Sequence, residues 1–392
     1  TRSRSSRDDF VASPDHVTLR ASTSGKLLGY KGRKGAFIWE GVPYAAPPVG
    51  QLRWRAPQPL RAPILDSVVV TTAPGAACSQ LPSLLSGEPN PGSIVHGYED
   101  CLYLNIYAPP EGENLPVMYW IHGGGNSIGT ASTYSGEQLA MKYNVVVVAI
   151  NYRLGVFGWF KHPALSGNNE EDNSGNYGTL DTIHGLKWVR DNISAFGGDP
   201  GNVTVFGESA GAFNTLAIIA SPLAKGLFHR AAVQSGGLSL ASIEQAQNHV
   251  EDGGHAFSSQ EIIKKLLLAD GTVTSAEAAT AYLRDIGEAD LRDYLYQQTP
   301  DAFLASLKAF SYGMVRLPGI TADGYVLPKL SAHEIFSDPN NHNQVPTILG
   351  TNRDEPSLFL LTNPDYVSQL FGVLPKVKDA AVFKRAVNYG AL

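Results

Sequence analysis

Short, mostly apolar runs recur along the chain and are separated by segments with helical spacing. Most of the runs are rich in β-branched residues, and all are too short to form a helix, which is typical of strands buried in a parallel sheet. We expect these runs to be neighbouring strands of one sheet. They cover residues 117–121, 145–150, 203–206, 231–233 and 347–349.

Helical patterns lie between several of these runs. In residues 178–196, apolar side chains recur at intervals of three and four, which is the period of one helix face. Gly197-Gly198 ends this pattern. A second helix is expected over residues 209–219. Strands and helices in alternation predict an α/β fold with a doubly wound, mostly parallel sheet and helices on both faces.

The segments outside this alternation have patterns of their own. Residues 17–44 combine short strand patterns with glycine-containing turns, which predicts an N-terminal antiparallel extension. Residues 242–307 are mainly helical in pattern and predict a cap or an insertion over the edge of the sheet. Residues 1–9 are polar and charged, and we expect residues 1–12 to be disordered. Because no composition break divides the chain, residues 1–392 are expected to form a single domain.

Charge and hydropathy exclude some classes of function. The chain has 30 Lys and Arg against 36 Asp and Glu, a net charge of −6. This charge does not favour binding to the phosphate backbone of a nucleic acid. The richest apolar run, residues 145–150, is too short to cross a bilayer. The first residues contain no apolar stretch like that of a signal peptide, and the chain begins without Met.

The chain contains two cysteines, Cys78 and Cys101. An even count fits one disulfide, which would indicate an oxidising compartment. On the count alone, two unrelated buried thiols are an equal alternative. Two thiols without a nearby histidine pair make a poor zinc site, so no metal is predicted.

The motif Gly207-Glu208-Ser209-Ala210-Gly211 carries the strongest chemical signal. It follows an apolar run and precedes a helical pattern, which is the context of a nucleophile elbow. The two glycines allow a turn so sharp that Ser209 stands above the sheet. The N–H of Ala210, at the helix N-terminus, would then point at a developing oxyanion. The alternative is a glycine-rich turn without chemistry.

A second motif, His122-Gly123-Gly124-Gly125, directly follows the run of residues 117–121. Consecutive glycines at the end of a strand let backbone N–H groups converge on one oxygen, as in the HGGG type of oxyanion hole. Gly124 and Gly125 are the predicted donors. A phosphate-binding loop is the alternative, but it would require a lysine after the glycines, and residues 126–128 supply none.

Together with these two motifs, the sequence resembles the type-B carboxylesterases, the family that includes the cholinesterases. Residues 37–57 (FIWEGVPYAAPPVGQLRWRAP) look like the N-terminal motif of that family, and residues 99–107 (EDCLYLNIY) look like its second signature. Residues 176–200 lead into the elbow as they do in the family. The resemblance covers nearly the whole chain and implies an α/β-hydrolase fold.

The resemblance also implies roles for individual residues. Cys101 lies in the second signature, where the family has a half-cystine, so a Cys78–Cys101 disulfide is expected, and with it a secreted or periplasmic location. The acid of the family corresponds to Glu355, with Asp354 as the alternative. The family usually has glycine after this acid, whereas this chain has Pro356, whose fixed φ would affect how Glu355 is placed.

The family places its histidine base after the acid, but none of the ten histidines of this chain follows Glu355. We therefore expect that the chain stops short of the general base, and that residues 1–392 alone are a poor esterase. His122 is expected to brace the glycine loop rather than to act as the base.

These features predict a hydrolase that cleaves small carboxylic esters through an acyl-enzyme on Ser209, without a cofactor. A non-catalytic, cholinesterase-like adhesion or binding domain is the alternative from another class. A lipase or an amidase on the same scaffold is a closer alternative. The natural ester and the oligomeric state do not follow from the sequence.

Overall fold

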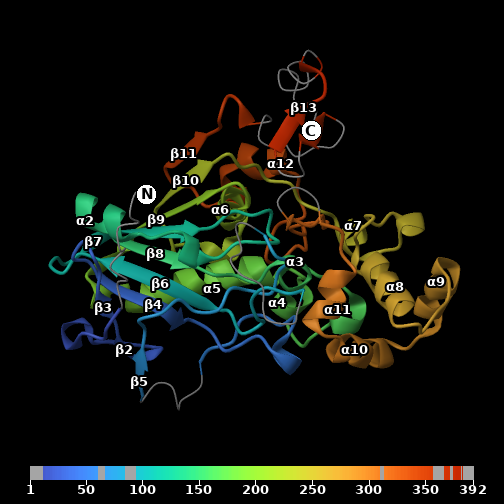
Figure 1. Cartoon of the computed structure of the whole chain (residues 1–392), viewed down its shortest axis with the longest axis horizontal. Coiled ribbons are helices and arrows are strands. Elements are labelled where there is room, and N and C mark those ends of the chain that lie inside the picture. The colour runs from blue at the N-terminus through green and yellow to red at the C-terminus, as the bar shows by residue number, and fades with distance from the viewer. Residues whose placement is uncertain are drawn as a thin grey trace, which may run out of the picture.

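An eight-stranded sheet forms the centre of the protein in the computed structural model, which describes residues 12–60, 67–83, 94–309, 313–355, 366–370, 374–380 and 382. The strand order is β11-β10-β9-β7-β8-β6-β4-β3 (Figure 1). The strands are β3 (Tyr30–Lys31), β4 (Phe37–Pro43), β6 (Tyr103–Ala108), β7 (Leu115–Ile121), β8 (Val146–Ile150), β9 (Gly198–Glu208), β10 (Arg230–Gln234) and β11 (Thr347–Gly350).

The sheet is mixed. Strands β8, β7, β9, β10 and β11 pair in parallel, and they are the five apolar runs of the sequence. Strands β3, β4, β6 and β8 pair in antiparallel fashion. The predicted α/β fold, with its parallel sheet and N-terminal antiparallel extension, is therefore confirmed. Two smaller sheets pair β1 (Arg20–Ser22) and β5 (Val68–Val70) with β2 (Gly25–Leu28), and β12 (Val367–Leu370) with β13 (Leu374–Val377).

Helices α5 and α6 pack on the sheet and bury its apolar centre. The first spans Tyr177–Asn192 and continues as a 3-10 turn to Phe196, and the second spans Ala210–Ala220, close to the ranges that the sequence predicts. The other helices near the sheet are α2 (Glu137–Tyr143), α3 (Gly155–Gly158), α4 (Glu170–Asn173) and α12 (Ala332–Ser337).

A group of helices lies beside one end of the sheet and forms a separate lobe in Figure 1. Its core joins the helices to Trp54 and Phe160, whose rings stack with their centroids 5.3 Å apart. Phe303 packs edge-on against Trp54. The helices are α7 (Ile243–Gln247), α8 (Ser259–Ala269), α9 (Ala276–Asp285), α10 (Glu288–Gln297) and α11 (Pro300–Ala305).

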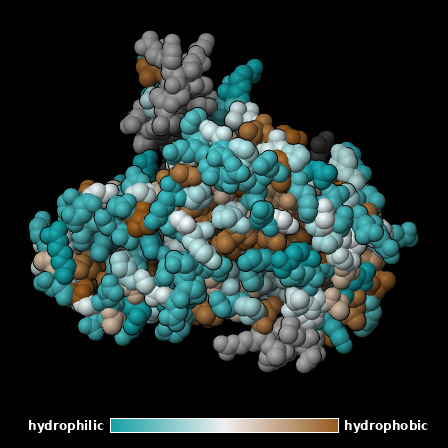
Figure 2. Space-filling model, turned by 180° about the vertical axis from the view of Figure 1, so that it is seen from behind, coloured by the Kyte–Doolittle hydropathy of each residue, from teal (hydrophilic) through white to brown (hydrophobic). Residues whose placement is uncertain are grey.

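Strand β11 departs from the sequence prediction. Its run predicts a buried strand, yet all four of its residues are exposed, with Ile348 at 75% and Leu349 at 68%. Within the described residues, β11 is the last strand of the sheet, pairs with β10 alone and has neither face covered. A groove of about 640 Å³ beside it is lined by apolar residues that include Leu216 and Ile219. Figure 2 shows that apolar side chains also reach the surface near the middle of the face opposite to that of Figure 1.

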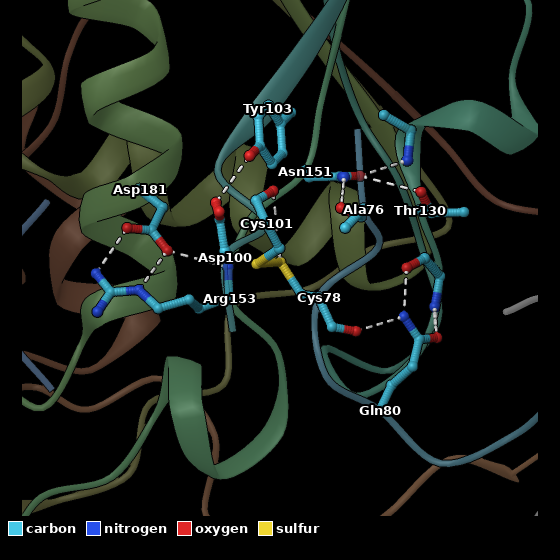
Figure 3. Close-up of a disulfide and its surroundings, with 12 residues drawn as sticks. Ala76, Cys78, Gln80, Asp100, Cys101, Tyr103, Thr130, Asn151, Arg153 and Asp181 are labelled. Atoms are coloured by element: carbon cyan, nitrogen blue, oxygen red, sulfur yellow. Dashed lines mark hydrogen bonds and ion pairs between the residues drawn. A yellow bond between two sulfur atoms is a disulfide. The ribbon is translucent and has the colours of Figure 1, made fainter. Parts of the chain in front are cut away.

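Cys78 and Cys101 form a disulfide, as the family resemblance implies (Figure 3). Both side chains are buried. The bond ties the segment that begins at Cys78 to the residues just before β6, and therefore to the central sheet.

Replacing both cysteines with alanine is expected to lower the free energy of unfolding by about 3 kcal/mol, because the unfolded chain regains the entropy of an open loop. Urea denaturation of the two proteins measures the difference. The unmodified protein in dithiothreitol serves as a control and should lose the same amount. An unchanged midpoint would show that the bond does not constrain the unfolded chain.

No helix in the described ranges combines the length and the apolar character that crossing a membrane requires. The predicted disorder of residues 1–12 concerns a segment that lies outside the described residues, except for Ala12.

Candidate active site

The parallel strands bring the motifs of the sequence together along one edge of the sheet, the edge formed by the carboxyl ends of these strands. The carboxyl ends of β7, β9, β10 and β11 all lie on this edge, because neighbouring parallel strands run in the same direction. The glycine loop follows β7, Ser209 follows β9 and Ser235 follows β10, whereas Glu355 lies five residues beyond the end of β11. In open α/β sheets this edge is where ligands bind.

Ser209 occupies a strained turn between β9 and α6. Its φ is 54° and its ψ is −123°, a backbone conformation that costs a non-glycine residue free energy. The flanking glycines make the turn possible. A Cβ on Gly207 would overlap the backbone of Gly211, and a Cβ on Gly211 would overlap the carbonyl oxygen of Ile121. The geometry is therefore that of the predicted elbow, with Ala210 as the first residue of α6.

The glycine loop passes directly beside this serine. A Cβ on Gly123 would lie 3.3 Å from the Cβ of Ser209. Gly124 and Gly125 have φ values of +108° and +61°, which a residue with a side chain rarely adopts. Within the described residues, no acceptor takes the N–H of Gly124 or Gly125. These two groups are therefore available to an oxygen atom of a ligand.

A polar network behind the loop was not predicted from the sequence. Asn126 and Asn214 exchange two amide hydrogen bonds of 2.8 and 3.3 Å. Tyr152 donates its hydroxyl hydrogen to the carbonyl oxygen of His122, at 2.6 Å. The asparagine pair joins the loop to α6, so it fixes the loop relative to the turn at Ser209. No motif signals this pair, since its members lie 88 residues apart.

Glu355 is held by the end of the neighbouring strand. Its Oε2 accepts the hydroxyl hydrogen of Ser235 at 2.8 Å and the N–H of Asn352 at 3.1 Å. The alternative acid, Asp354, instead pairs with the guanidinium of Arg353 at 3.2 Å on the exposed surface. The predicted effect of Pro356 concerns a residue outside the described ranges.

A second carboxylate, Glu208, also lies beside the glycine loop. Its Oε2 would be 3.1 Å from a Cβ on Gly123. Partial burial raises the pKa of Glu208, and the negative charge of Glu355 raises it further. The charge of Glu355 therefore reaches Glu208, the residue directly before Ser209.

His122 belongs to the scaffold of the loop. Its ring is buried, stacks on Tyr152 with a centroid distance of 4.5 Å, and contacts the carbonyl oxygen of Gly123 through Nδ1 at 2.9 Å. Burial lowers the pKa of His122 to about 4. The ring is therefore neutral at pH 7.

Two buried histidines make the fold sensitive to acid. Burial lowers the pKa values of both His122 and His162 to about 4, whereas in the unfolded chain they return to about 6.5. The unfolded state therefore binds more protons between pH 6.5 and pH 4. The stability contributed by the neutral rings is complete above pH 6.5 and is lost as the pH falls through 4, by roughly 3 kcal/mol for each ring.

His162→Asn tests this prediction, because asparagine still accepts the Ala164 N–H that the His162 ring now accepts at 3.1 Å. Chemical denaturation at pH 7 and pH 4.5 should show a smaller pH effect in this variant. The exposed His333, changed to Asn, is the control and should keep the full effect. An identical pH dependence in both variants would contradict the prediction.

All ten histidines lie among the described residues. None of them forms a hydrogen bond or an ion pair with Ser209 or Glu355. The structure thus brings the predicted nucleophile, the oxyanion donors and the acid to one edge, without joining a histidine to them. In the same ranges, no group of three or more His, Cys, Asp or Glu side chains is arranged to hold a metal ion.

Comparison with known proteins gives one consistent family. A sequence model of the carboxylesterase family matches residues 15–389. Para-nitrobenzyl esterase of Bacillus subtilis (strain 168) is 39% identical over 348 residues, which cover 88% of this chain and 64% of that protein. Liver carboxylesterase 1F of Rattus norvegicus is 37% identical, over 96% of this chain and 66% of its own length.

Solved structures agree with this result. A structure of PNB esterase has a TM-score of 0.69 and 35% identity, covering 90% of this chain and 66% of that one. A carboxylesterase of Geobacillus stearothermophilus, EST55, has a TM-score of 0.68 and 33% identity, covering 89% and 66%. The chain spans about two thirds of the length of these relatives.

Proposed function

Because the chain belongs to the carboxylesterase family, we propose that it hydrolyses small carboxylic esters through an acyl-enzyme on Ser209. One observation carries the proposal: Ser209 stands on a strained elbow directly beside the glycine loop, in which the N–H groups of Gly124 and Gly125 are available to a ligand. An oxygen that becomes negative during attack on a carbonyl group is the ligand that such donors stabilise best.

The residues divide the chemistry between them. Ser209 Oγ attacks the carbonyl carbon of the ester, and the N–H groups of Gly124, Gly125 and Ala210 bind the oxyanion. The alcohol then leaves with a proton, and water cleaves the acyl group from Ser209. A base must take the proton of Ser209, and Glu355 would hold the charged base in place.

The lack of a histidine base beside Ser209 limits the rate that we expect. Since none of the ten histidines is joined to Ser209 or Glu355, we expect residues 1–392 to turn over slowly on their own. The oxyanion donors and substrate binding would leave only a residual rate.

External imidazole tests the proposal, because it can take the place of a side-chain base. The chain should hydrolyse p-nitrophenyl acetate faster as imidazole is added, beyond the rate that imidazole produces with Ser209→Ala. Mass spectrometry should find an acetyl group on the peptide that contains Ser209. Equal rates for the two proteins, and no acetylated peptide, would refute the proposal and favour a non-catalytic binding domain.

The disulfide supports a proposal about location. A buried Cys78–Cys101 bond is typical of proteins that fold in an oxidising compartment. We therefore propose that the protein is secreted or periplasmic. Fractionation of the source cells, with the thiol state of both cysteines measured in each fraction, tests this proposal.

A further inference from the structure

The side chain of Gln80 clamps the far end of the glycine loop. Its Oε1 accepts the N–H of Gly129 at 2.7 Å, and its Nε2 donates to the carbonyl oxygen of Gly129 at 2.9 Å. Nε2 also donates to the carbonyl oxygen of Cys78 at 2.9 Å. Gln80 is completely buried. Figure 3 shows the amide facing the loop, with its hydrogen bonds as dashed lines.

Gly129 lies against the residues that form the start of the loop. Its φ is +110°, and a Cβ there would lie 2.6 Å from His122 Nδ1 and 2.8 Å from the carbonyl oxygen of Gly123. The preceding residue, Ile128, brings its carbonyl oxygen to the place that a Cβ on Gly124 would occupy. A restraint on Gly129 therefore acts on Gly124 through direct contact.

The disulfide anchors the clamp to the central sheet. Gln80 follows Cys78 by two residues, and Cys101 lies just before β6. The main chain of Gln80 also exchanges two hydrogen bonds with His96, of 3.0 and 2.9 Å. Gln80 is thus held near both ends of the loop that the disulfide closes, through Cys78 on one side and through His96, close to Cys101, on the other.

A parallel contact holds the next residues of the loop. The side chain of Asn151, at the end of β8, donates to the carbonyl oxygen of Ala76 at 2.9 Å and accepts the N–H of Ala131 at 2.8 Å. The segment of residues 76–80 is therefore joined to residues 129–131 by two buried amides, as Figure 3 shows.

We propose that Gln80 is a positioning residue for the oxyanion hole, and that it transmits the rigidity of the disulfide to Gly124 and Gly125. This inference rests on the proposed function. Donors to an oxyanion act only when they are held in place before the reaction, because misplacement by about 1 Å costs a large part of the rate. Gln80 touches neither substrate nor nucleophile, and it acts through the loop.

Hydrogen exchange tests the clamp without any catalysis. Gln80→Met keeps a side chain of similar length but removes the amide donor and the strong acceptor. We expect the amides of residues 122–131 to exchange about tenfold faster or more, because the loop opens locally. Gln80→Asn retracts the amide by one methylene group without burying a charge, and it provides a second variant if the methionine variant does not fold.

Asn192→Leu is the matched control, because it also removes a buried amide. Asn192 bonds Thr23 and Trp188, away from the loop. This variant should leave exchange in residues 122–131 unchanged. Unchanged exchange in folded Gln80 variants would overturn the clamp.

Kinetics test the catalytic part of the inference. With imidazole present, the Gln80 variants should show about tenfold lower kcat with little change in KM, because the oxyanion forms only in the transition state. Faster exchange with an unchanged kcat would overturn the positioning role. If even the unaltered chain shows no Ser209-dependent hydrolysis, the proposed function and the positioning role both fail, whereas the exchange result still decides the clamp.

Discussion

Substituting Gly124 with valine is expected to reduce imidazole-assisted turnover by about 10²–10³, the usual cost of losing one oxyanion donor. Gly124 has φ +108°, and its missing Cβ leaves room for the carbonyl oxygen of Ile128. A valine must displace this backbone, and the Gly124 N–H turns away with it. Initial rates with p-nitrophenyl acetate measure the loss, with circular dichroism to verify folding.

Gly271→Val separates this effect from backbone strain. Gly271 also has a positive φ, +78°, but nothing lies within 4 Å of its would-be Cβ. Its substitution should lower stability by about 1–2 kcal/mol and leave turnover unchanged. Near-normal turnover by a folded Gly124→Val variant would show that the oxyanion is bound elsewhere.

Replacing Asp181 with alanine is expected to cost about 3–5 kcal/mol of stability, because it leaves a buried charge without its partner. The Arg153 guanidinium donates to both carboxylate oxygens of Asp181, at 2.7 and 2.8 Å. The side chains are only 3% and 0% exposed. Figure 3 shows this pair beside the disulfide. Urea denaturation measures the loss.

Two further variants identify the cause of that loss. The Arg190–Asp191 pair has similar geometry, but its side chains are 51% and 45% exposed, so Asp191→Ala should cost less than about 1 kcal/mol. Replacing both buried partners, as in Arg153→Met with Asp181→Leu, should recover most of the stability. A double variant as unstable as Asp181→Ala would mean that packing, rather than charge, determines the effect.

Local patterns were enough to predict the elements that carry the candidate site. The β-branched runs identify β7 to β11, because a buried parallel strand needs an apolar residue at nearly every position. The glycines around Ser209 identify the elbow, because the turn leaves no space for a Cβ. Exposure was predicted less well, since the run of residues 347–349 does not record that β11 lies at the edge of the sheet.

Contacts between distant residues could not be predicted. The bonds from Gln80 to Gly129 and from Ser235 to Glu355 join residues 49 and 120 positions apart. Such pairs have no period and no fixed spacing, and they follow only from the way the strands pair. The sequence therefore indicates the candidate reactive residues, whereas the structure indicates which contacts hold them in place.

The candidate site is built from strand ends that are far apart in sequence, and this affects how it forms while the chain is synthesised on the ribosome. Ser209 Oγ emerges long before Glu355, and Ser235 receives the acid only after β10 has paired on both sides. Pairings this distant in sequence form slowly. A nascent chain therefore exposes Ser209 before Glu355, its candidate acid, has been synthesised, and Glu355 reaches Ser235 through the pairing of β10 with β11.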